Sequence, residues 1–121
     1  MFNGYPMSML QIAFAMFAAG AGGGLLFTTL IVLNKRYPRW FGSGHGLLGL
    51  SALAVLAYAV SQSTSPISSA TWWAAGVLGM AWCGGVVMFR VLRPKSRPLV
   101  LALMHGGLAL AGIYLLYRVA F

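Results

Sequence analysis

Residues 38–50 read PRWFGSGHGLLGL, and residues 98–110 read PLVLALMHGGLAL. When the chain is compared with itself after a shift of 60 residues, the two stretches coincide at proline, histidine, glycine and leucine. The matching pairs are Lys35/Lys95, Pro38/Pro98, His45/His105, Gly46/Gly106, Leu48/Leu108 and Leu50/Leu110, with Ala15/Ala75 and Gly24/Gly84 further upstream. Leucine matches are common in an apolar chain, but proline, histidine and glycine matches in one register are not. The pattern therefore predicts two tandem copies of one structural unit, a helical hairpin.

The composition decides the environment of this unit. Of 121 residues, 60% are hydrophobic and 7% are charged, and the charged residues are eight Lys or Arg with no Asp or Glu. A soluble domain carries about 25% charged residues, so this chain is predicted to lie in a membrane. The lack of carboxylate side chains also excludes an Asp/Glu acid–base pair, a hard-cation cage and a carboxylate proton relay within the chain.

Four apolar segments are each about long enough to cross a bilayer as a helix. They are Met9–Leu33, Phe41–Val60, Thr71–Leu92 and Leu99–Val119. All five prolines lie at the borders of these segments or between them, where proline is tolerated. Because the connections are short, neighbouring helices are expected to run antiparallel. We predict an all-α fold: residues 1–121 form one transmembrane four-helix up-down-up-down bundle, made of hairpins over about residues 9–60 and 71–119.

Arg118 is the only charge near the other side of this bundle, and the remaining seven basic residues gather at two connections on one side. They are Lys35, Arg36 and Arg39 at the first connection and Arg90, Arg93, Lys95 and Arg97 at the third. The positive-inside rule then predicts that both clusters face the cytoplasm and that both termini lie outside it, as in a bacterial inner membrane. The charge thus indicates topology and not nucleic-acid binding. The first segment has no basic residue before it and no clear small-residue cleavage site after it, so we expect it to be retained.

The only two histidines occupy equivalent positions in the two units. Each of them, His45 and His105, follows a proline by seven residues, which places both about 10 Å into the membrane from the cytoplasmic end. The second and fourth helices of such a bundle are parallel and diagonal, about 11–14 Å apart. Two imidazoles with one iron between them fill about that gap. We therefore predict that His45 and His105 are the axial ligands of one haem b.

Neighbouring residues favour this interpretation. Glycine leaves room for a porphyrin beside its ligands, cations pair with the propionates, and hydroxyl groups can accept a hydrogen bond from a ligating imidazole. The residues predicted to surround the cofactor are Gly46, Gly106, Gly107, Arg36, Arg39, Arg93, Arg97, Thr28 and Thr29. Gly84 and Gly85 are expected to add room from the third helix, and Ser43 and Ser51 are alternative acceptors.

With His45 and His105 on its second and fourth helices and glycines beside them, the chain resembles the b-type cytochromes, in particular the cytochrome b561-like electron carriers. The resemblance covers the whole chain in architecture. It implies electron transfer through a bis-histidine haem, with quinol or another redox partner. Those cytochromes commonly hold two haems on four histidines, whereas this chain can hold one. A single haem near the cytoplasmic face favours exchange with quinol, or haem sensing or carriage, over electron transfer across the membrane.

Three alternatives stay open beside this prediction. The histidines could simply hydrogen-bond across a helix interface, which would make the chain a small non-enzymatic subunit or scaffold. Seven methionines and Cys83 allow a copper-handling protein, because thioethers suit Cu(I). An anion-handling role is the third, although Phe27-Thr28-Thr29 is only a faint echo of a fluoride-channel motif, and the Glu of small multidrug exporters is absent.

Partners and catalysis are less constrained. The spacings Gly20-x3-Gly24 and Gly42-x3-Gly46 permit close helix packing, within the chain, in a homodimer or in a larger membrane complex. The lipid bilayer is the partner that composition predicts directly. No residue is placed for covalent or acid–base catalysis, so we expect an electron carrier at most and no enzyme acting alone.

Overall fold

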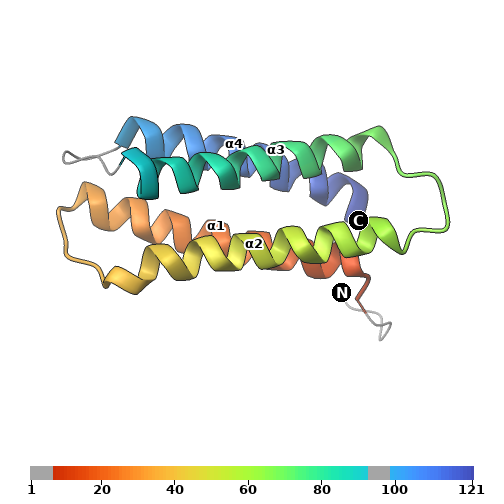
Figure 1. Cartoon of the computed structure of the whole chain (residues 1–121), viewed down its shortest axis with the longest axis horizontal. Helices are drawn as coiled ribbons and strands as arrows, with labels where there is room; N and C mark the ends of the chain where they lie inside the picture. The colour runs from red at the N-terminus through yellow and green to blue at the C-terminus, as the bar shows by residue number, and fades with distance from the viewer. Residues whose placement is uncertain (1–6, 93–98) are drawn as a thin grey trace.

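The computed structural model describes residues 7–92 and 99–121, and the fold is all-α across them (Figure 1). The helices are α1 (Met9–Val32), α2 (Arg39–Ser61), α3 (Ser69–Val86), continued by a π-helix η1 (Val87–Leu92), and α4 (Leu99–Ala120). The predicted class, an all-α four-helix bundle, is confirmed. Every predicted segment border lies within two residues of an observed one, while the π-helical end of the third span was not predicted.

Short polar residues explain both ends of α1. The Ser8 hydroxyl accepts the Gln11 backbone N–H at 3.2 Å, and the Gln11 side chain accepts the Ser8 N–H at 3.0 Å, which forms a capping box. At the other end Asn34 has a φ of 54°, a left-handed conformation that asparagine tolerates. This conformation lets the Lys35 N–H reach back to the Leu30 carbonyl at 2.9 Å, which closes the helix and reverses the chain.

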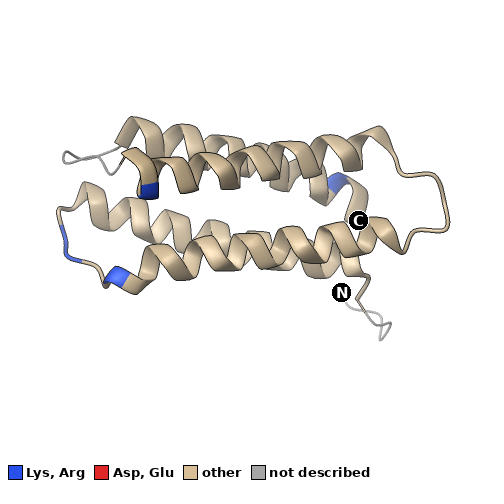
Figure 2. Cartoon of the chain, viewed as in Figure 1, with Lys and Arg blue, Asp and Glu red and all other residues tan. Residues whose placement is uncertain are grey.

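The four helices form an antiparallel bundle in which α2 and α4 are diagonal. α1 packs against α2 and α4, and α3 packs against α4 and α2. The start of α1, the end of α4 and the α2–α3 connection share one end of the bundle (Figure 1). The opposite end carries basic side chains, which lie in the α1–α2 connection, at the start of α2 and at the end of η1 (Figure 2). Arg118 lies apart from them, in the last turn of α4. We call the two ends the terminal end and the basic end.

The outside of the bundle is apolar along its length. Four helical spans are long and apolar enough to cross a membrane: Met9–Val32, Arg39–Ser61, Ser69–Leu92 and Leu99–Ala120. Large side chains in the middle of these spans face outward, and Leu25 is 72% exposed and Leu110 61%. Such a surface would be unfavourable in water but is well solvated by lipid tails. The architecture therefore fits an integral membrane protein.

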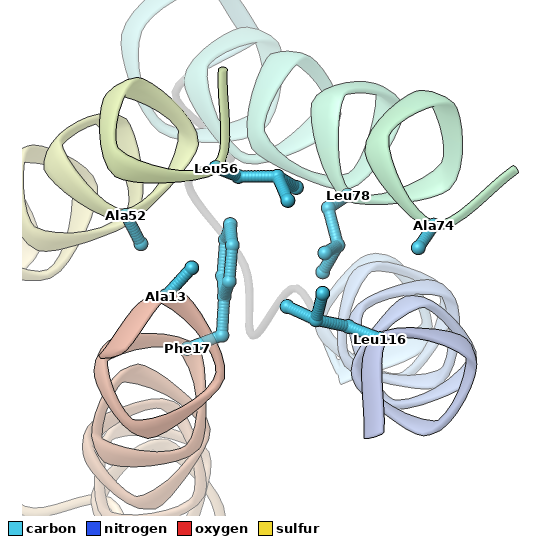
Figure 3. Close-up of a cluster of buried hydrophobic side chains, with 7 residues drawn as sticks. All are labelled: Ala13, Phe17, Ala52, Leu56, Ala74, Leu78 and Leu116. Carbon is cyan, nitrogen blue, oxygen red and sulfur yellow. The ribbon is translucent and has the colours of Figure 1, made fainter. Parts of the chain in front are cut away.

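A cluster of buried apolar side chains fills the terminal half of the bundle (Figure 3). It draws on all four helices and consists of Ala13, Phe17, Ala52, Leu56, Ala74, Leu78 and Leu116. The ring of Phe17 and the three leucines point toward one another, and alanines at the rim allow the helices to approach (Figure 3). Gly112 is needed for the closest approach of α4 to α3, since a Cβ there would lie 2.7 Å from Leu78 Cγ.

The buried positions add a structural observation to the predicted repeat. Ala52 and Leu56 of α2 are buried, as are Gly112 and Leu116 of α4, 60 residues later. In α1 and α3 the corresponding buried positions are 61 residues apart, not 60. The buried positions that correspond at this offset are Ala13/Ala74, Phe17/Leu78, Gly20/Ala81 and Phe27/Met88.

The sequence matches Ala15/Ala75 and Gly24/Gly84 are therefore not structural equivalents. One residue turns a helix by about 100°, so a shift of 60 residues pairs positions on different faces of α1 and α3. Gly24 lies against His45, whereas nothing lies within 4 Å of a Cβ built on Gly84. The residue of α3 that corresponds to Gly24 is Gly85, which lies against His105.

Candidate functional site: a histidine pair inside the bundle

His45 and His105 meet inside the basic half of the bundle. Each is the seventh residue of its helix, α2 or α4, so the two side chains lie at the same depth, about 9 Å along the helix axis from its start. Their ring centroids are 6.1 Å apart, and the rings are inclined at 75°. The structure thus brings together the two residues that the sequence predicts as ligands, across the diagonal of the bundle.

His105 is held by a backbone carbonyl of α3. Its Nδ1 lies 2.8 Å from the carbonyl oxygen of Ala81. A helical carbonyl is normally covered by the side chain four residues later, and here that residue is Gly85. A Cβ on Gly85 would lie 2.9 Å from His105 Cε1, so the missing side chain is what admits the ring to the carbonyl. With Nδ1 donating to Ala81, Nε2 of His105 is left as the acceptor nitrogen of a neutral imidazole.

His45 packs against α1 without an equivalent bond. A Cβ on Gly24 would lie 3.2 Å from His45 Cε1, and one on Gly23 would lie 3.8 Å from His45 Nδ1. The Nδ1 atom is buried and has no hydrogen-bond partner among the described residues. A buried polar atom without a partner is costly, by about 1–3 kcal/mol, and calls for an explanation. A ligand that engages this imidazole would provide one.

Trp82 is a member of the site that sequence reasoning missed. Its indole N–H donates to the carbonyl of Gly46 at 2.8 Å, which joins α3 to α2 one residue beyond His45. Gly49 admits the ring, since a Cβ there would lie 3.1 Å from Trp82 Cδ1. The only sequence indication was a tryptophan in the middle of a span, away from the interfaces where tryptophan usually anchors.

The cations predicted to pair with propionates lie at the basic end. Arg36 and Arg39 are exposed there. The Arg90 guanidinium donates to the Ser43 hydroxyl at 2.7 Å, so a cation bridges η1 and α2 within one turn of His45. Arg93 and Arg97 lie outside the described residues.

The remaining predicted residues among those described make no side-chain hydrogen bond to the imidazoles. Thr28 and Thr29 donate to the carbonyls of Gly24 and Leu25, four residues earlier in the same helix, at 2.9 and 2.8 Å. This local bond is the usual choice of a hydroxyl inside a helix, so the acceptor for His105 is a carbonyl and not a threonine. Gly106 and Gly107 have nothing within 4 Å of a built Cβ, and Gly46 takes part through its carbonyl.

Three of the residues that suggested copper are exposed on the outside of the bundle. Cys83 is exposed on α3, Met80 is 59% exposed, and Met104 is 67% exposed. Within residues 7–92 and 99–121 there is no group of three or more His, Cys, Asp or Glu side chains that could hold a metal ion. A metal ion at the histidine pair would therefore find two imidazoles there and no further His, Cys, Asp or Glu ligand among the described residues.

Comparisons of the chain with protein-family models, with curated proteins and with solved structures gave no match. The function is accordingly inferred from the geometry of the histidine pair.

Proposed function

We propose that this protein is a small membrane cytochrome that binds one b-type haem between His45 and His105 and uses it for electron transfer. The observation that carries the proposal is the 6.1 Å separation of the two ring centroids. Two imidazoles bound to one metal ion from opposite sides, through bonds of about 2 Å, have ring centres roughly 6 Å apart. The pair is thus already spaced for a shared metal centre.

Haem matches the rest of the donor set better than a bare metal ion does. A structural zinc ion takes four protein ligands, and the pair supplies two. A haem brings four nitrogens of its own and needs one axial ligand on each side, which is what two facing imidazoles provide. At the depth of the pair the flanking helices carry Gly23, Gly24 and Gly85, so the chain presents small residues beside its ligands.

The charge distribution favours a haem whose propionates point toward the basic end of the bundle. The chain has no Asp or Glu, so its basic end has no side-chain carboxylate of its own to pair with. Arg90, held against Ser43, together with Arg36 and Arg39, would receive the haem propionates as charge-assisted hydrogen bonds. We propose that this end faces the cytoplasm, by the positive-inside rule, and that electrons pass there to quinol or a protein partner.

The bound haem would supply one-electron chemistry, and the chain's own residues would set its conditions. His105, fixed on Ala81, would present Nε2 in a defined direction, and the surrounding apolar helices would exclude water. Trp82 and Gly46 would keep α3 against α2 beside the ligand.

The test is a visible spectrum of the detergent-purified protein, loaded with haem during expression or by titration. We expect about one haem per chain, a sharp Soret band, and split α and β bands after reduction. His45→Ala and His105→Ala should each abolish the low-spin spectrum, whereas Leu47→Ala, an exposed change on α2, should leave it intact. If the wild-type protein shows no Soret band at saturating haem, the histidines only pack and the proposal is wrong.

A further inference from the structure

The repeat makes the two histidines equivalent, but their surroundings are not. At the offset that relates α1 to α3, Gly85 beside His105 corresponds to Gly24 beside His45, and Ala81 corresponds to Gly20. Ala81 holds His105 through its carbonyl at 2.8 Å. The Gly20 carbonyl is the equivalent acceptor for His45, yet Nδ1 of His45 has no partner among the described residues. One ligand of the pair is therefore anchored and the other is not.

The anchoring bond matters for ligand strength. A carbonyl that accepts the Nδ1 proton fixes the tautomer and the ring orientation and makes Nε2 a stronger donor to a metal. Loss of such a bond typically weakens metal affinity about 10–100-fold. His105 has this support and His45 lacks it, so the bond from His45 is the weaker of the two.

Both rings lie close to a glycine of the neighbouring helix. A Cβ built on Gly85 would lie 2.9 Å from His105 Cε1, and one built on Gly24 would lie 3.2 Å from His45 Cε1. The rings are therefore closely packed on both sides, and the hydrogen bond is what distinguishes them. His45 Nδ1 has no hydrogen bond among the described residues to break when the ring turns.

We infer that His105 is the permanent ligand of the site, that His45 is exchangeable, and that the protein binds a small neutral diatomic molecule in the position that His45 leaves. The inference rests on the proposed haem site. With haem bound as proposed, His105 would stay in place while His45 would give up its ligand position to the incoming molecule, an exchange that would need no electron transfer. The protein would then bind a gas such as CO or NO in addition to transferring electrons.

Carbon monoxide is the probe. The haem-loaded protein, reduced with dithionite, is titrated with CO and followed by its difference spectrum. We expect the wild-type protein to form a CO complex, and His45→Ala to keep its haem and bind CO at least tenfold more tightly, because no internal ligand competes. We expect His105→Ala to hold haem about 10–100-fold more weakly than His45→Ala does. The rate of haem transfer to apomyoglobin measures that difference.

Two glycine variants test the same inference without changing either histidine, in case a histidine variant does not fold. Gly85→Ala pushes His105 from the Ala81 carbonyl and should speed haem loss about 10–100-fold. Gly24→Ala presses on the exchangeable ligand instead, and should raise CO affinity while speeding haem loss less than Gly85→Ala does.

The outcomes separate the two proposals. A bis-histidine spectrum with no CO binding, or equal haem loss in the two histidine variants, overturns the exchangeable ligand and leaves the haem site standing. A faster haem loss in Gly24→Ala than in Gly85→Ala overturns it as well. The absence of any Soret band in the wild-type protein overturns both.

Discussion

The two halves of this bundle are held together by different means. The terminal half is packed: Leu56, Leu78 and Leu116 are at most 2% exposed, and they close around Phe17 (Figure 3). In the basic half, side-chain N–H groups of one helix reach backbone carbonyls of another, from His105 to Ala81 and from Trp82 to Gly46.

Glycine serves opposite purposes in the two halves. Gly112 lets two helices approach until apolar side chains touch, whereas Gly85 and Gly49 uncover space for a polar ring. The terminal half thus holds the buried leucine cluster, whereas the basic half combines aromatic packing of Phe27 against Phe41 and Phe89 with the hydrogen bonds that keep the polar pair in position. Three experiments test this division, in order of decreasing effect on stability.

Leu56→Ala should produce the largest loss. Leu56 is 1% exposed at the centre of the terminal cluster, and removing a buried leucine side chain costs about 2–5 kcal/mol through lost contacts and the cavity that remains. Because lipid and not water solvates the unfolded helices, we expect the lower end, roughly 2 kcal/mol, in SDS-induced unfolding followed by circular dichroism. Leu47→Ala on the same helix, at a position 64% exposed, should change stability by less than about 0.5 kcal/mol. The division fails if Leu56→Ala weakens haem binding as much as His105→Ala.

Gly112→Ala should come next. The new Cβ would lie 2.7 Å from Leu78 Cγ and 3.2 Å from Val77 Cγ1, so α3 and α4 must move apart. Overpacking of this kind costs about 1–3 kcal/mol. The control is Gly76→Ala on α3, where a Cβ meets nothing within 4 Å and alanine is the better helix former. Equal unfolding midpoints for the two variants would contradict the close approach at Gly112.

Trp82→Phe should have the smallest effect on stability. It keeps an aromatic ring and removes the N–H that donates to Gly46 at 2.8 Å. Hydrogen bonds between membrane helices contribute about 0.6 kcal/mol on average and up to about 1.7 kcal/mol. Trp72→Phe, on the same helix but 58% exposed, should be neutral in the same unfolding assay. A loss above 2 kcal/mol would mean that the basic half carries more of the stability than its hydrogen bonds explain.

Much of the fold could be predicted because it depends on properties of single segments. Hydropathy and the positions of the prolines gave the four spans to within two residues. The π-helical end of the third span was missed, since no residue type in Val87–Leu92 marks it. The buried positions of α2 and α4 correspond at the 60-residue shift of the sequence matches, whereas those of α1 and α3 correspond at 61 residues. Identical residues such as Gly24 and Gly84 do not report which face of a helix points inward.

The candidate site was predicted in part. The histidines were found because they are the only two in the chain and share one spacing from a proline. The sequence predicted threonine or serine hydroxyls as acceptors for a ligating imidazole, whereas the acceptor that His105 has in the structure is the carbonyl of Ala81. Backbone carbonyls are present at every residue, so only the rotation of α3 about its axis selects one.

The sequence by itself determined that this protein is a bundle of four apolar helices with seven of its eight basic residues toward one end and with two histidines at one depth. These features follow from composition and from distance along a helix axis, which are fixed by counting residues. The tertiary structure decided which face each helix turns inward. It thereby decided that His105 is anchored on Ala81 while Nδ1 of His45 is left without a partner among the described residues. Rotation about a helix axis changes by about 100° per residue and is set by packing against neighbouring helices, so it becomes defined only when all four are assembled.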